Sequence, residues 1–146
     1  MVDMQRKAVM KKAGELLNQG WHCSEAVLIA VGERFFDVTP EKIKLATPFA
    51  GGVAGTHEDL CGALTGGVMV IGGVMGRWDS KTDDQACMDA TAAYRKKFHD
   101  HFDHLHCCDL KDNWVGKPGQ PDCAELVRQA AGLLLDVLSD AGLEPK

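Results

Sequence analysis

The feature that most constrains the fold is the helical spacing of apolar residues, which recurs in almost every segment of this 146-residue chain. In the first segment the apolar residues fall at i, i+4, i+7 and i+8 and so share one helix face: Val9, Ala13, Leu16 and Leu17. No segment alternates apolar and polar residues as a half-buried strand does. The pattern predicts an all-α fold, a single-domain bundle of five or six helices over residues 1–146.

Start and stop signals divide the chain into these helices. Gly20 is a natural helix stop, and a second helix follows from about Ser24. The run Thr39-Pro40-Glu41 combines a capping residue, a proline suited to the first turn and an acid suited to the positive end. A capping box at Ser80–Asp83 predicts the start of a long helix, and Asp122 is expected to cap the last one.

The uncharged stretch from Leu60 to Gly76 predicts a glycine-rich central helix. Its length of about 25 Å is below the hydrocarbon thickness of a bilayer, so stable membrane insertion is not expected. Gly62, Gly66, Gly73 and Gly76 fall on one face. That face would allow a close approach of another helix, of a flat cofactor at Gly62 and Gly66, or of a second copy in a homodimer.

Three of the six cysteines lie at predicted helix starts: Cys23, Cys61 and Cys123. Free backbone N–H groups and the helix dipole favour a thiolate there, so these thiols are expected to have lowered pKa values. Thiolates ligate metals and attack disulfides, which points to metal or redox chemistry. The alternative is that a free cysteine packs as a small apolar side chain, and this applies best to Cys87, on the buried face of the long helix.

A second group of donors lies in the run HDHFDHLHCC, residues 99–108. If the helix continued, His104 would share a face with Cys108, and His99 with Asp103, at i, i+4 spacing. We therefore consider a separate zinc or other transition-metal site at His99, His104 and Cys108. The alternative is a solvated face near a helix end, where a protonated histidine suits the dipole.

Several classes of function are excluded or disfavoured. A net charge of −5 and only 6% aromatic residues argue against nucleic-acid binding. The chain has no Cys-x-x-Cys, so a thioredoxin-type dithiol, the usual zinc-ribbon hairpins and c-type haem attachment are out. The N-terminal residues show no export signal, which predicts a cytoplasmic location, where structural disulfides are rare.

The cysteine-bearing segments resemble a family of redox-active proteins named for a C…GCAxxG…C…C pattern. The resemblance covers about residues 14–140 and lies in GWHCSEAVLIA, FAGGVAGTHEDLCGALTGGVMVIG, HCCDL and DCAELVRQAAGLLLDVL. It implies a small helical redox domain with signature cysteines at Cys23, Cys61, Cys107 and Cys123, and leaves Cys87 and Cys108 as extra. The family name writes Gly-Cys where this chain has Cys61-Gly62. A similar domain beside the haem modules of split-Soret cytochromes is associated with an iron–sulfur cluster.

Four hypotheses about function follow. The first is electron transfer to a redox partner protein through an iron–sulfur cluster on Cys23, Cys61, Cys107 and Cys123, since iron or zinc would neutralise four converging thiolates. The second is a thiol–disulfide protein that uses the same cysteines without metal. The third is a zinc or transition-metal binding helical module. The fourth is a helical interaction module without chemistry.

Overall fold

The computed structural model describes residues 1–146 and confirms an all-helical chain. It has seven α-helices and one 3₁₀ turn: α1 (Asp3–Asn18), α2 (Cys23–Gly32), α3 (Pro40–Ala46), η1 (Thr47–Phe49), α4 (Gly62–Met75), α5 (Gln85–Phe102), α6 (Cys107–Asn113) and α7 (Cys123–Asp140). The prediction of five or six helices is therefore slightly too low, because it omits the short helix α6.

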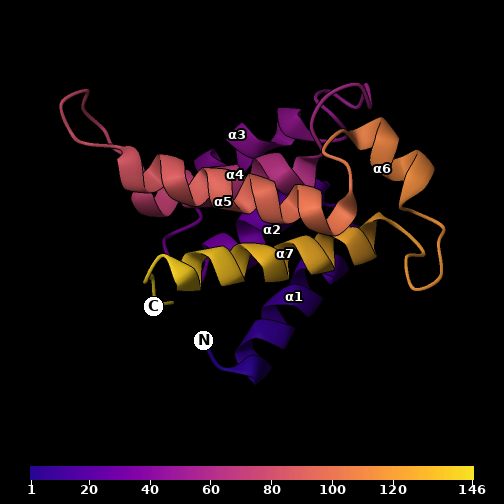
Figure 1. Ribbon diagram of the computed structural model, residues 1–146, viewed down its shortest axis with the longest axis horizontal. Helices are drawn as coiled ribbons and strands as arrows, with labels where there is room; N and C mark the ends of the chain where they lie inside the picture. The colour runs from indigo at the N-terminus through magenta and orange to yellow at the C-terminus, as the bar shows by residue number, and fades with distance from the viewer.

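The helix α7 packs against α1, α2, α4 and α5 (Figure 1). Its start is fixed as expected, since the Asp122 carboxylate accepts a hydrogen bond from the Glu125 N–H at 3.0 Å. Its apolar stripe is buried in the common core, including Leu126, Val127 and Leu134. These five helices thus share one hydrophobic core. No helix in the chain has the length and hydrophobicity needed to cross a membrane.

The glycine face of α4 packs against other parts of the same chain. A Cβ at Gly66 would lie 2.5 Å from the Ser24 carbonyl oxygen, and one at Gly62 would collide with the Cys23 sulfur, so both glycines allow α2 to approach. Farther along, Gly73 lies against the Phe36 ring. This face is therefore occupied by α2 and the segment after it, and neither a flat cofactor nor a second copy is needed to cover it.

The region between α4 and α6 departs from the expected boundaries in two places. The predicted capping box at Ser80–Asp83 does not start α5, which begins at Gln85 after an exposed loop. The same helix ends at Phe102, because Asp103 adopts the left-handed conformation with φ of +65°. The chain then turns and starts α6 at Cys107, so His104 and Cys108 do not share the helix face that the sequence suggests.

Candidate redox site

Four cysteines stand at the starts of four different helices. Cys23, Cys107 and Cys123 are the first residues of α2, α6 and α7, and Cys61 is the residue that caps α4. All four line one cavity of about 500 Å³. The structure thus brings together every cysteine that the resemblance singles out, from segments far apart in sequence, and all six cysteines are free thiols.

A short antiparallel pairing holds the starts of α4 and α6 together. Leu60 and His106 form an isolated β-bridge, next to which the Cys61 N–H donates to the Leu105 carbonyl oxygen at 2.8 Å. In return the Cys107 N–H donates to the Asp59 carbonyl oxygen at 2.9 Å. These bonds satisfy backbone groups that a helix start leaves open. They also hold Cys61 and Cys107 on two neighbouring antiparallel segments of the chain.

The start of α2 is anchored by buried polar groups. The Ser24 hydroxyl donates to the Ala46 carbonyl oxygen at 2.8 Å. The buried Glu25 carboxylate accepts hydrogen bonds from the His22 N–H at 2.9 Å and from the Thr47 hydroxyl at 2.7 Å. With both carboxylate oxygens paired, the burial of this charge is compensated. Cys23 is therefore held against the first turn of α4.

A left-handed turn over residues 51–55 forms another wall of the cavity. All five residues have φ between +55° and +71°, although Val53 and Ala54 are not glycines. This conformation is costly for a β-branched residue such as Val53. At Gly52 a Cβ would lie 2.8 Å from the Cys107 Cβ, so the turn is packed directly on that cysteine.

For Cys61, Cys107 and Cys123 the pKa is raised, where their helix starts suggest a lowered value. Burial raises the pKa of Cys61, and the neighbouring Cys23 raises it further, while the N–H groups of Ala63 and Leu64 act in the opposite direction. Burial also raises the pKa of Cys123 and of Cys107, although the Lys111 ammonium works against it at both. The N–H groups at the start of α4 do lower the pKa of Cys61, as expected, but desolvation and the charge on Cys23 raise it by more.

Three basic residues at the cavity were not identified from the sequence. His22, His57 and Lys111 line it together with the thiols, and no acidic side chain does. His22 could have been noticed as the neighbour of Cys23. Lys111 stands four residues after Cys107, on the same face of a helix that the sequence analysis missed. The spacing of Cys107, Leu110 and Trp114, all buried, was the signal for that helix.

The remaining donors lie elsewhere. Cys87 is on α5 and Cys108 lies beside the Asp109 carboxylate at 3.9 Å, and neither lines the cavity. His99 is exposed and lies 3.9 Å from the Asp100 carboxylate. Gly62 and Gly66 lie behind the site, against α2, and do not line the cavity.

The donor geometry bears on the kind of metal centre that would fit. As the side chains lie, no three His, Cys, Asp or Glu side chains are placed to ligate a single ion. Four thiols around a cavity of about 500 Å³ form a donor set of the type that holds iron–sulfur clusters, which take four cysteine thiolates. Cys23, Cys61, Cys107 and Cys123 are the residues that could hold a metal centre at this cavity.

A helical domain that gathers four free thiols from four helix starts into one cavity is, by class, a cysteine-based redox protein. The comparison with protein families agrees: the chain belongs to the family described as "Putative redox-active protein (C_GCAxxG_C_C)", whose model matches residues 21–137. No curated protein and no solved structure matches the chain.

Proposed function

We propose that this protein transfers electrons through an iron–sulfur cluster held by Cys23, Cys61, Cys107 and Cys123. The observation that supports the proposal most directly is that these four thiols, and neither of the other two, line one cavity. A cluster bound there would accept and release single electrons. The electron donor and acceptor would be a partner protein that docks near the cavity mouth.

The raised thiol pKa values favour a metal-bound state over free thiol chemistry. Disulfide exchange needs a thiolate, and burial raises the pKa of Cys61, Cys107 and Cys123. A buried thiolate is stabilised when a cation takes the place of the proton. Cys61, Cys107 and Cys123 resist ionisation as free thiols, so they are suited to ionise together when they bind iron.

Other residues at the cavity would tune such a centre. The N–H groups of Ala63 and Leu64 already stabilise charge on the Cys61 sulfur, and Lys111 does so at Cys107 and Cys123. Hydrogen bonds and positive charge at the sulfurs raise the reduction potential. The apolar side chains of Leu110 and Leu126 limit the access of water from the core side.

The proposal is tested by iron and sulfide analysis of protein purified or reconstituted without oxygen, together with its visible absorption spectrum. We expect iron, acid-labile sulfide and visible absorbance, all lost when any one of the four cysteines is replaced by serine. Cys108→Ser is a matched control next to Cys107, and Cys87→Ser is a second one on α5; both should keep the chromophore. Protein without iron, sulfide or absorbance would refute the proposal.

The second candidate is a thiol–disulfide protein, which the gathering of four free thiols also supports. Mass spectrometry after reduction and mild oxidation separates the two functions. A disulfide cycle predicts the loss of two hydrogen atoms per bridge between cavity cysteines, in protein that contains no metal. Six freely alkylated thiols before and after oxidation would exclude it.

A further inference from the structure

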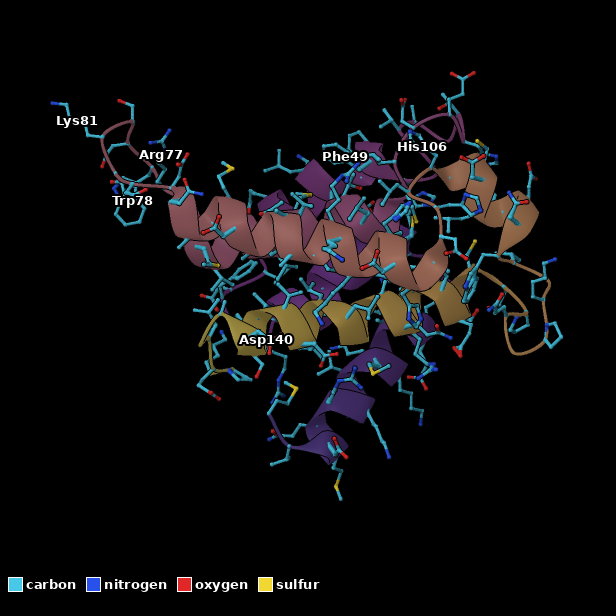
Figure 2. The ribbon with its side chains drawn as sticks, in the orientation of Figure 1. Phe49, Arg77, Trp78, Lys81, His106 and Asp140 are labelled. Carbon is cyan, nitrogen blue, oxygen red and sulfur yellow. The ribbon has the colours of Figure 1, made fainter.

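The loop between α4 and α5 presents a tryptophan almost completely to solvent. Trp78 is 96% exposed. Figure 2 shows Trp78, Arg77 and Lys81 on a loop that projects from one end of the molecule, far from His106 at the other end. A large aromatic side chain gains much from burial and is a frequent anchor of protein interfaces. Its exposure on a projecting loop therefore suggests a contact with another molecule.

Hydrogen bonds within the loop hold its shape. The Arg77 guanidinium donates to the carbonyl oxygens of Ser80 at 3.0 Å and Thr82 at 2.7 Å. The Asp79 carboxylate accepts from the N–H groups of Lys81 at 2.8 Å and Thr82 at 3.0 Å. Because the loop is ordered before it binds, little conformational entropy is lost when it docks.

A groove at the same end of the molecule offers a site of matching chemistry. It has a volume of about 340 Å³ and lies between α5 and α7, with apolar side chains at its base, among them Ala90, Ala93 and Val137. The charged side chains that line it are Asp89, Asp140 and Lys97, so acidic groups outnumber basic ones. Asp140 takes part in none of the ion pairs within the chain, and neither does Lys81.

We propose that the occupant of this groove is Trp78 of a second copy of the chain, and that two copies exchange their loops around a two-fold axis. The Trp78 side chain (the knob) and the groove lie at the same end of the molecule, since Met75, which lines the groove, is only three residues before Trp78. When two copies exchange these surfaces reciprocally about a two-fold axis, both grooves are filled and the assembly closes as a dimer, whereas a one-way contact would propagate.

Charge also favours a second copy. Lys81, at the tip of the loop, is available to pair with the Asp140 carboxylate at the edge of the partner's groove. The four-cysteine cavity lies at the start of α4 and the loop follows its end, about 20 Å away for a helix of 14 residues. Both redox cavities would therefore stay open in the dimer.

The experiment is sedimentation equilibrium of the full chain, in reductant, from micromolar to near-millimolar concentration. We expect a monomer–dimer equilibrium in the wild type, and a blue shift of tryptophan emission as the dimer forms and Trp78 is buried. Trp78→Ala is expected to weaken the dimer at least tenfold, and Ala93→Arg, which fills the groove, by a similar factor. Met88→Ala, an exposed apolar residue on α5 outside knob and groove, is the matched control and should leave the dimer unchanged.

A charge exchange tests the orientation of the two copies. Lys81→Glu and Asp140→Lys should each weaken the dimer, and the double variant should restore it, because the pair forms again with reversed signs. Circular dichroism of each variant checks that the helices are intact. A wild type that stays monomeric throughout, or a dimer that survives Trp78→Ala, overturns the proposal; in the first case another protein would be the partner of the loop.

Discussion

Gly62 has a hydrogen atom at the position where any other residue would place a Cβ against the Cys23 sulfur. The meeting of Cys23 and Cys61 depends on the missing side chain at Gly62, and Gly66, one turn later, allows the same close approach of α2 to α4. The inverted order Cys61-Gly62, compared with the family name, follows the same geometry, since the thiol comes from the capping residue and the next residue stays small.

Gly62→Ala is expected to destabilise the protein by about 1–3 kcal/mol, because the added methyl group overpacks the contact between α2 and α4. The matched control is Gly72→Ala in the same helix, where nothing lies within 4 Å of the added Cβ. That change is expected to stabilise the protein by about 0.5–1 kcal/mol through helix propensity. Urea unfolding measures both, and equal effects at the two sites would contradict the assigned role of Gly62.

Ionisation of Cys61 provides a second prediction, on pH. Burial raises the pKa of this thiol in the folded protein above its ordinary value of 9.0. In metal-free protein the unfolded chain then loses this proton first, so the free energy of unfolding is unaffected below pH 9 and falls as the pH rises above it. Between pH 7.5 and pH 10 the free energy of unfolding, measured with urea, should fall less for Cys61→Ala than for the wild type. An equal loss in both would contradict the prediction.

Among the helices, the break between α5 and α6 is the one that shapes the site. A continuous helix would have carried Cys107 and Cys108 away from the cavity. Instead Asp103 turns the chain, residues 104–106 run alongside the segment before α4, and Cys107 starts a new helix facing Cys61. The sequence gives little warning of this, because aspartate is a less common residue than glycine at a left-handed helix end.

Asp103→Gly is expected to stabilise the protein by about 0.5–1 kcal/mol, because glycine adopts positive φ without strain. Asp103→Val should destabilise it by a larger amount, since a β-branched side chain disfavours that conformation. The Asp103 side chain is exposed, so neither change affects the core. Thermal unfolding ranks the three proteins, and a ranking other than Gly, Asp, Val would contradict the assigned turn.

At the scale of the whole molecule, the core and the site are largely separate. A cluster of thirty buried residues joins five long helices, and of the four cavity cysteines only Cys61 belongs to it. The core is thus built from apolar side chains of the helices, and the same helices present four helix starts to one cavity. The expected role of these cysteines is chemical more than structural.

Replacement of all four cavity cysteines by serine is therefore expected to leave a folded, helical protein without redox activity. Far-ultraviolet circular dichroism should show nearly wild-type helix content, and unfolding should stay cooperative, while iron binding and reversible thiol oxidation at the cavity are lost. Loss of the helical signal would mean that the thiols support the fold. The Cys87→Ser and Cys108→Ser double variant serves as the control.

Properties that depend on neighbours along the chain could be predicted from the order of the residues. The all-helical fold, the buried face of α5 and the Asp122 cap followed from periodicity and capping, which act within a few residues. Three of the four helix-start cysteines followed in the same way. Only the packed fold shows that the four thiols share a cavity, that α2 covers the glycine face, and that burial raises the pKa of Cys61. Burial and long-range contact depend on the whole fold, and no local pattern in the sequence records them.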